Sequence, residues 1–571
     1  MIVLVALFST FYTLIASEAF LPTDDCPILG PTFPSDFDIT ATSAFQDATA
    51  IFPSLIDSLF SSGAVNKDNT TFTIDVFSAA TNNSIYSYRH EGPGQNGTLT
   101  TGILDENTIF RTGSVSKLMT TYALLVYTGG LGVFDHPVTT YLPELAGNAQ
   151  ADPLQNIVWE DITIGALASQ MGGTGSFRKL VTCKCSVNDF HLVYFEALRS
   201  TKRPVFAPFA TSLYSDSGFG ILGRILERMT GLSYNDAIQK ILSEPLGLNS
   251  LTSFAPSGED LNAFVFPGNK SVSPWANDNQ IFAPYLTHRS GGIYTSNADL
   301  RTVGLAMLHS SLLPKTTTRE WMKPRAHTAT LAFSNGAPWE IYRLALPVSP
   351  GSTRTRISDL YTKAGGNGVY SAIFALSPDH GIGFSILLGG QGATHDRWPL
   401  RNLVGETFVT AAEHAAVERG TETMTGTFVS ETLDETNLTL TTDADKPGLG
   451  LKEWFIGGVE SRANIIQPGA EIPTENLTVR LYPTGLRSQG SGCNAASGSG
   501  TELLSFRAIP QVTPVTGRAA AEGGEGMFDG ACMGWLSVDF FTTDDFVLQF
   551  VNGRVKKVFH PFFQIWMTRV E

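Results

Sequence analysis

The chain has 571 residues, and its 38 Lys and Arg stand against 53 Asp and Glu, which gives a formal net charge of -15. A length of this order indicates more than one domain, and 42% hydrophobic against 16% charged residues excludes a disordered chain. The acidic balance argues against nucleic acid as a partner, because a polyanion-binding protein needs a basic surface.

The chain begins with an apolar segment. Residues 1–16 carry no charged side chain, and Ser17-Glu18-Ala19 then places a small residue on either side of position 18. This order is typical of a secretory signal peptide, so we expect residues 1–19 to be removed and the protein to be secreted. The alternative is an uncleaved anchor, but the segment is shorter than the roughly 20 residues of a membrane span. We expect no membrane span in the mature chain.

Secretion would place the cysteines in an oxidising compartment. We expect Cys493 to pair with Cys532, and Cys26 with Cys183 or Cys185, which leaves one thiol over. We expect neither a metal at these cysteines nor a cofactor, because no His or second Cys pair stands at ligand spacing. Asn-x-Ser/Thr sequons are compatible with glycosylation, although chance would give nearly as many. They begin at Asn69, Asn82, Asn96, Asn269, Asn437 and Asn476.

In chain order, the hydrophobic periodicity first predicts a helix over 40–60 and two strands over 71–78 and 84–88. Capping residues and C-terminal glycines then delimit three helices in the middle of the chain, at 114–127, 217–230 and 233–242.

Strands return at 359–363, 369–376 and 383–388, with a turn at 377–381, before a helix at 401–417. Strand, helices and strands in one unit of nearly 400 residues favour an α+β fold. We expect an antiparallel sheet flanked by helices, with an inserted all-helical subdomain, over residues 20–418.

From residue 419 the pattern changes to short alternating runs separated by Gly-, Ser- and Ala-rich loops. These runs predict a small all-β domain of sandwich or barrel type over residues 419–571. The expected strands are 426–430, 438–442, 477–482, 535–541, 546–550 and 565–569.

A Ser-x-x-Lys pair, Ser114 and Lys117, opens an apolar helix. Residues three apart lie on one helical face, so the amine can reach the hydroxyl. A serine needs such a base to act as a nucleophile, and the helix N-terminus favours negative charge at the hydroxyl. Ser176 and Lys179 match the same pattern, but Ser176 follows a Gly-rich loop without a long helix after it. The other interpretation of Ser114 is a helix-capping serine beside a solvent-facing lysine.

Two further motifs favour catalysis. Tyr214 stands in a polar turn before a helix, followed by Ser215 and Asp216, and a phenol there can relay a proton. Lys363 lies at a strand end before Ala364, Gly365 and Gly366. Its charge and the close backbone approach that glycine permits suit substrate binding. Alone, Tyr214 would be a rim tyrosine and Lys363 a strand-end charge, but the combination is much rarer by accident.

The set SVSK, YSD and KAG resembles the Ser-x-x-Lys, Tyr-x-Asn and Lys-Thr/Ser-Gly motifs of the serine β-lactamase and penicillin-binding protein superfamily. The likeness covers about 37–417 and points to class C β-lactamases, D-amino-acid peptidases and family VIII esterases. Flanking phrases such as FRTGSVSKLMT and GVYSAIFALSPDHGIGFSILLGG support it. The C-terminal part resembles the β-domain that is appended to some secreted fungal members.

The resemblance implies a role for each matched position. Ser114 would be the acylated nucleophile, Lys117 its base or proton shuttle, Tyr214 a second acid or base, and Lys363 an electrostatic partner. The backbone N–H groups of Ser114 and Gly366 would form the oxyanion hole.

Two positions depart from the family pattern. Asp216 replaces the usual Asn, and Ala364 the usual Thr or Ser. Both departures disfavour β-lactams and other acyl groups that carry a carboxylate, because they add a negative charge and remove a hydroxyl. We expect neutral esters or amides to be the better substrates.

The sequence thus predicts a secreted serine hydrolase acting on esters or amides of small molecules or peptides through an acyl-enzyme. One alternative is an acyltransferase of natural-product biosynthesis with the same intermediate. Another is a non-catalytic binding member of the family, although the intact motifs argue against it. The acyl group, the acceptor, the oligomeric state and the role of the C-terminal domain stay open.

Overall fold

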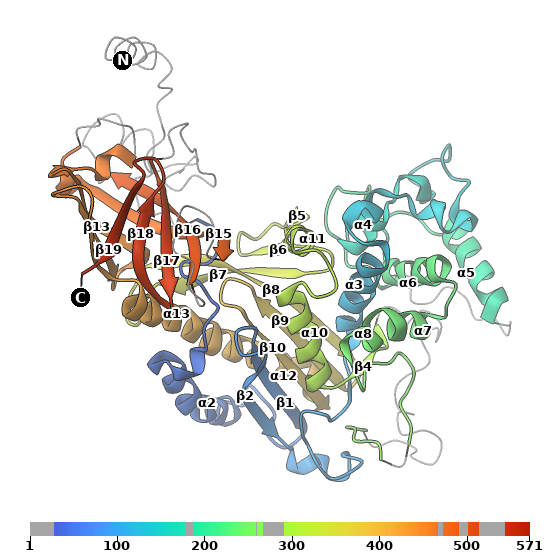
Figure 1. The fold of residues 1–571 in the computed structure, drawn as a ribbon. Helices are drawn as coiled ribbons and strands as arrows, with labels where there is room; N and C mark the ends of the chain where they lie inside the picture. Colours follow the sequence, from blue (N-terminus) through green and yellow to red (C-terminus); the bar gives the residue numbers. More distant parts are fainter. Residues whose placement is uncertain are drawn as a thin grey trace. The chain divides into compact units, whose positions relative to one another are not determined.

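The computed structural model describes residues 28–176, 187–258, 260–266, 291–465, 472–489, 501–512 and 543–570. The expected signal peptide, the five cysteines, the sequon at Asn269 and the strand expected at 535–541 lie outside these ranges. The chain divides into two compact units. One comprises Asp36–Leu344 and Asp359–Ala412, and the other Met1–Ser35, Ala345–Ser358 and Glu413–Glu571. Figure 1 shows the helices and strands of the described residues as a ribbon coloured along the sequence.

The first unit is built on an eight-stranded antiparallel sheet with the order β2-β1-β10-β9-β8-β7-β6-β5. Every residue of β1, β9 and β10 is buried, polar side chains such as Asp75 included, because both faces of the sheet are covered. All the strands expected here are confirmed, whereas β5, β6 and β7 were missed. The bounds are β1 Thr70–Ser78, β2 Asn83–His90, β5 Ala326–His327, β6 Phe333–Asn335, β7 Glu340–Pro347, β8 Thr355–Asn367, β9 Tyr370–Ser377 and β10 Ile382–Gly390.

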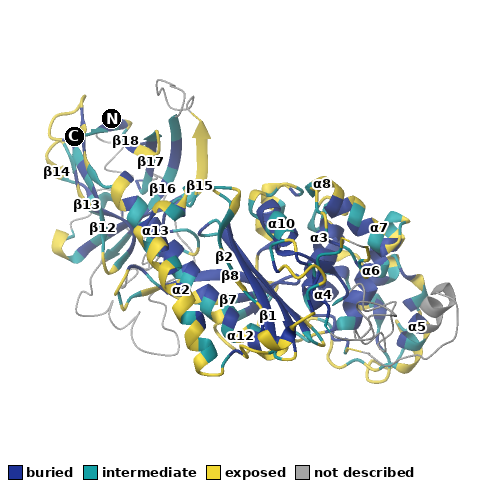
Figure 2. Ribbon diagram, turned by 90° about the horizontal axis from the view of Figure 1, so that it is seen from below, coloured by how far each residue is buried: buried dark blue, intermediate teal, exposed yellow. Residues whose placement is uncertain are grey.

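Helices cover both faces of this sheet. Figure 2 shows α2 (Ser43–Ser61) and α12 (Ala393–Val404) on one face and α10 (Asn297–His309) on the other. The helix expected at 40–60 is confirmed, and the one expected at 401–417 belongs to a longer helical stretch of α12, a π-helical turn and α13 (Thr410–Thr423). No helix of the described ranges is long and apolar enough to cross a membrane.

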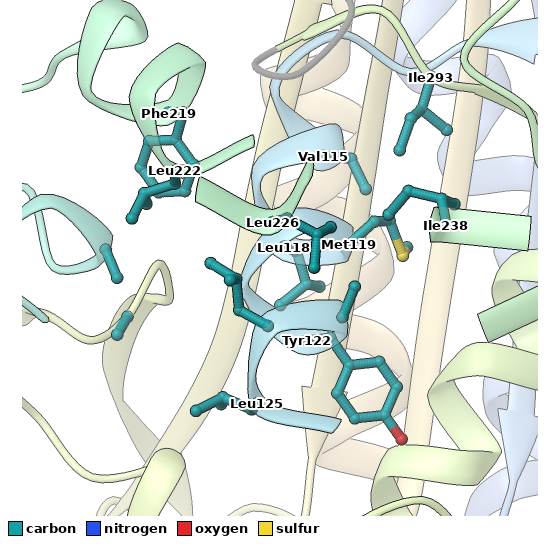
Figure 3. Packing of buried hydrophobic residues seen from close by; sticks show 14 of the residues in the cluster. Val115, Leu118, Met119, Tyr122, Leu125, Phe219, Leu222, Leu226, Ile238 and Ile293 are labelled. Carbon is teal, nitrogen blue, oxygen red and sulfur yellow. The ribbon is translucent and has the colours of Figure 1, made fainter. Parts of the chain in front are cut away.

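The inserted part is helical, as expected. Its central helix α3 is buried from Ser116 to Leu125, including the polar side chains of Ser116, Lys117, Thr120 and Thr121. Figure 3 shows Leu118 and Met119 of α3 next to Leu226 of α6 and Ile238 of α7 within the buried cluster. The Tyr122 ring points the other way and stacks on Trp321, with ring centroids 5.4 Å apart. This packing holds the start of α3 rigidly. The bounds are α3 Ser116–Thr128, α4 Ile164–Ala168, α5 Val187–Thr201, α6 Asp216–Thr230, α7 Tyr234–Ile238, α8 Glu244–Leu246 and α11 Lys315–Trp321.

The second unit contains a nine-stranded antiparallel sheet with the order β12-β11-β19-β18-β17-β16-β15-β13-β14. An additional pairing of β12 with β13 closes it, so the domain is a barrel rather than a sandwich. Five of the expected strands are present, and β13, β14, β16 and β18 were missed. The bounds are β11 Gly426–Ser430, β12 Asn437–Asp443, β13 Lys446–Ile456, β14 Val459–Glu460, β15 Leu477–Gln489, β16 Thr501–Val512, β17 Asp545–Val551, β18 Arg554–His560 and β19 Ile565–Arg569.

A buried ion pair ties separate segments into this second unit. Arg356 and Glu413 are both almost completely buried, and their closest atoms are 2.6 Å apart. The Arg356 guanidinium also donates to the carbonyl oxygen of Gly30, and Thr32 donates to the Glu413 carboxylate. These contacts explain why short segments before the sheet and between β7 and β8 group with the barrel rather than with their sequence neighbours.

Candidate active site

Ser114 lies in a short 3₁₀ turn, Gly113–Val115, that leads directly into α3. The turn is fixed by Ser116, whose hydroxyl donates to the carbonyl oxygen of Gly113 and accepts the N–H of Ile293. Lys117 follows in the first turn of the helix, with its amine 2.9 Å from the Ser114 hydroxyl oxygen. The Lys117 side chain is fully buried, so its position is set by packing. The interpretation of Lys117 as a solvent-facing residue is therefore wrong.

Asp216, the first residue of α6, lies on the other side of Lys117. Its carboxylate accepts a hydrogen bond from the Lys117 amine at 2.7 Å. The sequence predicted a negative charge at this position that disfavours acyl groups with a carboxylate. Instead the carboxylate faces the lysine amine. Lys117 thus lies between the Ser114 hydroxyl and the Asp216 carboxylate.

Tyr214 completes the group around Ser114. Its ring lies 4.9 Å from the Lys117 amine and 5.3 Å from the Lys363 amine. Burial alone would raise the pKa of the phenol, but the charges of Lys363 and Lys117 and a hydrogen bond with Ser114 outweigh it, so that its pKa is lowered. A phenol of lowered pKa that is hydrogen-bonded to a serine can serve as the acceptor of the serine proton.

Lys363 reaches the site from β8 and is also almost fully buried. Its amine is 2.5 Å from a carboxylate oxygen of Glu340, the first residue of β7. Burial opposes the charge of the lysine, but Glu340 and Tyr214 outweigh that effect and raise the pKa of Lys363. The expected positive charge is therefore present, together with a carboxylate that the sequence did not reveal.

The end of β8 approaches the Ser114 turn so closely that only glycine fits. A Cβ atom added to Gly365 would collide with the carbonyl oxygen of Thr112 and lie 2.8 Å from the Ser114 nitrogen. A Cβ on Gly113 would collide with the Gly366 nitrogen, and Gly113 has a φ of +55°. This backbone contact places the Ser114 and Gly366 segments side by side, as an oxyanion hole between their N–H groups requires.

These residues surround a cavity of about 500 Å³. Six of the eight expected site residues line it, namely Ser114, Tyr214, Lys363, Ala364, Gly365 and Gly366. Lys117 and Asp216 contact this group but do not line the cavity. Within the described ranges, no group of three His, Cys, Asp or Glu side chains could hold a metal ion.

The sequence interpretation missed three prominent residues of the cavity wall: Glu340, Arg397 and Trp398. The Arg397 guanidinium lies over the Trp398 ring and donates to the carbonyl oxygen of Gly365 at 2.8 Å. Glu340 is the first residue of an unpredicted strand, and the other two lie on α12 before the expected start of the helix. No local motif marks any of them.

Ser176, the second match to the Ser-x-x-Lys pattern, supports the Tyr214 turn. Its hydroxyl donates to the carbonyl oxygen of Tyr214 at 3.3 Å and accepts the N–H of Asp216 at 3.0 Å. Lys179 lies outside the described residues. The contacts of Ser176 are those of a residue that positions Tyr214 and Asp216.

Ser176→Ala should therefore have a small effect. A hydrogen bond of this kind contributes about 0.5–1.5 kcal/mol, so we expect kcat/KM for an ester to fall by about tenfold or less. The fraction of protein that reacts with a serine-directed fluorophosphonate should stay the same, as measured by intact mass. Loss of that reaction in a correctly folded Ser176→Ala variant would contradict the assignment.

Comparisons with known proteins show which families the chain is similar to. A family model described as "Beta-lactamase" matches residues 87–406, and one described as "Beta-lactamase-like-like, C-terminal domain" matches residues 416–571. A "Probable hydrolase" of Phoma sp. is 26% identical over 71% of this chain and 68% of its own length. A "Beta-lactamase-like protein" of Arthroderma benhamiae is 24% identical over 90% of each chain. A class C beta-lactamase structure from Rhodobacter sphaeroides covers 64% of this chain and 100% of its own, with 20% identity and a TM-score of 0.44.

Proposed function

The chain belongs to the beta-lactamase family, and from this premise we propose that it is a serine hydrolase that forms an acyl-enzyme on Ser114. The substrates proposed are esters or amides of small molecules or peptides. The observation that supports this most directly is the contact of the Ser114 hydroxyl with both Lys117 and Tyr214. A nucleophile within reach of a proton acceptor and a hydrogen-bonding amine is the arrangement that covalent acyl transfer needs.

In the first half of the proposed reaction, the Ser114 oxygen bonds to the carbonyl carbon and its proton passes to Tyr214. Lys117 donates a hydrogen bond to the reacting oxygen, and the N–H groups of Ser114 and Gly366 stabilise the negative charge on the carbonyl oxygen. The bond to the leaving group then breaks, and the leaving group takes the proton from Tyr214. The product is an ester of Ser114.

In the second half, a water molecule attacks this ester while Tyr214 accepts a proton from it. The bond between the acyl carbon and the Ser114 oxygen breaks, the serine regains its proton, and the acid leaves. An alcohol or amine in place of water would make the same protein an acyltransferase. The ratio of acid to transferred product in the presence of an added alcohol or amine distinguishes the two outcomes.

The experiment that tests the proposal combines a fluorophosphonate with a panel of nitrophenyl esters and anilides. We expect one covalent adduct per chain and release of nitrophenol from at least the neutral short-chain esters. A folded protein that forms no adduct and turns over no member of the panel would contradict the proposal and favour a non-catalytic binding member of the family.

We also propose that the protein is secreted. The support is the apolar segment at residues 1–16 and the accessibility of the described sequons. Asn82 and Asn96 are exposed, and Asn69, Asn437 and Asn476 are partly exposed, so none of the five is buried. A glycosylated asparagine has to be accessible in this way.

The pH dependence gives a test of the charges around Tyr214. The Asp216 carboxylate raises the pKa of the phenol, against the two lysines that lower it. Asp216→Asn removes this effect, so the pKa of Tyr214 should fall further and its basic form should appear at lower pH. We therefore expect the acid limb of the pH profile of kcat/KM to move to lower pH.

The control for this prediction is Glu453→Gln, which makes the same change of charge at an exposed residue of β13. The acid limb of the control should coincide with that of the parent. An acid limb of Asp216→Asn that stays in place or moves to higher pH would show that Tyr214 is not the group that titrates.

A further inference from the structure

Glu340 places a carboxylate inside the cavity at the point where β7 and β8 meet. One carboxylate oxygen is 2.5 Å from the Lys363 amine, and the other accepts the backbone N–H of Ala364 at 2.9 Å. The side chain is 22% exposed, so it faces the cavity rather than bulk solvent. The backbone is fixed as well, because Thr362 donates to the Glu340 carbonyl oxygen at 2.8 Å.

This carboxylate completes the set of partners around Lys363. A lysine ammonium has three N–H donors. Two of those of Lys363 are directed to Glu340 and to the carbonyl oxygen of Ala364 at 2.8 Å, and the amine lies 5.3 Å from the centre of the Tyr214 ring. The side chain is 2% exposed, which leaves no free face for a further acceptor. An anionic substrate group could therefore bind Lys363 only by displacing Glu340.

The same carboxylate acts on the second cation of the cavity wall. Burial lowers the pKa of Arg397, and the charge of Glu340 opposes that shift. The Arg397 guanidinium is also held by the carbonyl oxygen of Gly365 and the hydroxyl of Ser371. Glu340 thus reduces the positive potential on both sides of the cavity.

We infer that Glu340 is a specificity-determining residue, an internal carboxylate that occupies the anion-binding position beside Lys363 and restricts the enzyme to electrically neutral acyl groups. The inference rests on the proposed acyl-enzyme chemistry and adds the class of acyl group. It also moves the cause of this selectivity away from Asp216, which is paired with Lys117, to the carboxylate that contacts Lys363.

The test compares two esters that differ only at the end of the acyl chain, 4-nitrophenyl butyrate and mono-4-nitrophenyl succinate. The parent should prefer the butyrate. Glu340→Gln keeps the size of the side chain but removes its charge, which frees the charge of Lys363. The ratio of kcat/KM for the succinate ester to that for the butyrate should rise by about tenfold or more, as expected for a hydrogen bond to a charged group.

Three further variants isolate the cause. Glu340→Asp keeps the charge and should stay closer to the parental ratio than Glu340→Gln does. Glu453→Gln removes a charge on the barrel and should leave the ratio unchanged. Ala364→Thr adds the hydroxyl that lactam-active relatives have, but the ratio should not rise because Glu340 still occupies Lys363. A rise in the ratio of succinate to butyrate kcat/KM in Ala364→Thr would overturn the inference, even if Glu340→Gln failed to fold.

Other outcomes separate this inference from the proposed function. A parent that uses both esters equally, or an unchanged ratio in folded Glu340→Gln, would overturn the role of Glu340 alone. A parent that hydrolyses neither ester would contradict the proposed function. In that case titration calorimetry with succinate tests the role of Glu340, because Glu340→Gln should bind succinate about tenfold more tightly than the parent does. Equal affinities would overturn the inference.

Discussion

Ser114→Ala should lower kcat/KM for any ester substrate by about 10⁴-fold or more, because removal of the nucleophile abolishes the covalent route. The cavity, the backbone N–H groups and the ion pair between Lys117 and Asp216 do not depend on the serine hydroxyl. The variant should therefore fold and bind substrate as the parent does. The measurement is the initial rate of nitrophenol release at saturating and at low substrate, together with circular dichroism and a thermal melt.

Ser176→Ala is the matched control, since it removes a hydroxyl from the second Ser-x-x-Lys pattern of the same unit. It should keep most of the activity, whereas Ser114→Ala should keep none above background. If instead Ser114→Ala is active and a folded Ser176→Ala is inactive, Ser176 rather than Ser114 is the nucleophile.

Tyr214→Phe should cost about 10²–10⁴ in kcat/KM, the usual contribution of a positioned acid or base. The phenylalanine keeps a ring close to the amines of Lys117 and Lys363. Only the hydroxyl that is hydrogen-bonded to Ser114 is lost. Because the lowered pKa of this phenol sets the acid limb of the pH profile in our account, that limb should also disappear or change its midpoint.

If Tyr214→Phe keeps both the parental kcat/KM and the acid limb of its pH profile, Lys117 rather than Tyr214 accepts the proton of Ser114. Lys117→Arg then provides the comparison, because an arginine keeps the charge but does not deprotonate. If Lys117 is the base, Lys117→Arg should lose activity and the pH dependence should vanish with it. If Lys117 is a fixed cation beside Asp216, the acid limb should persist in whatever activity remains.

Much of the fold was predictable because its signals are local. β1 alternates between apolar and polar residues, and β9 and β10 are mostly apolar, so all three strands are easily recognised. Ser114 and Lys117 are three residues apart on one helical turn, and their contact follows from helix geometry alone. Together the three motifs contain six of the twelve residues that line the cavity, although Lys363 lies inside β8 rather than at the strand end that the sequence predicted.

The contacts that define the charge of the site were not predictable, because they join residues far apart in sequence. Asp216 meets Lys117 across 99 positions, and its usual counterpart in the family pattern suggested contact with the substrate rather than with the lysine. Glu340 meets Lys363 because β7 and β8 are neighbours in the sheet, yet β7 was not recognised as a strand.

The C-terminal domain shows the same limit. Its alternating runs predicted strands, but closure depends on the pairing of β12 with β13, which no composition reveals. β13 itself contains Pro447, Gly448 and Gly450, residues that argue against a strand in sequence. The choice between sandwich and barrel therefore needed the structure.

The most direct test of the central claim is to trap the acyl-enzyme during turnover of 4-nitrophenyl butyrate. The protein is quenched in acid within the first turnover, digested, and examined by tandem mass spectrometry. Our account predicts a butyryl group on Ser114 that is lost in Ser114→Ala and retained in Ser176→Ala. A butyryl group on Ser176 or on any other side chain, or efficient turnover without an adduct on Ser114, would contradict it.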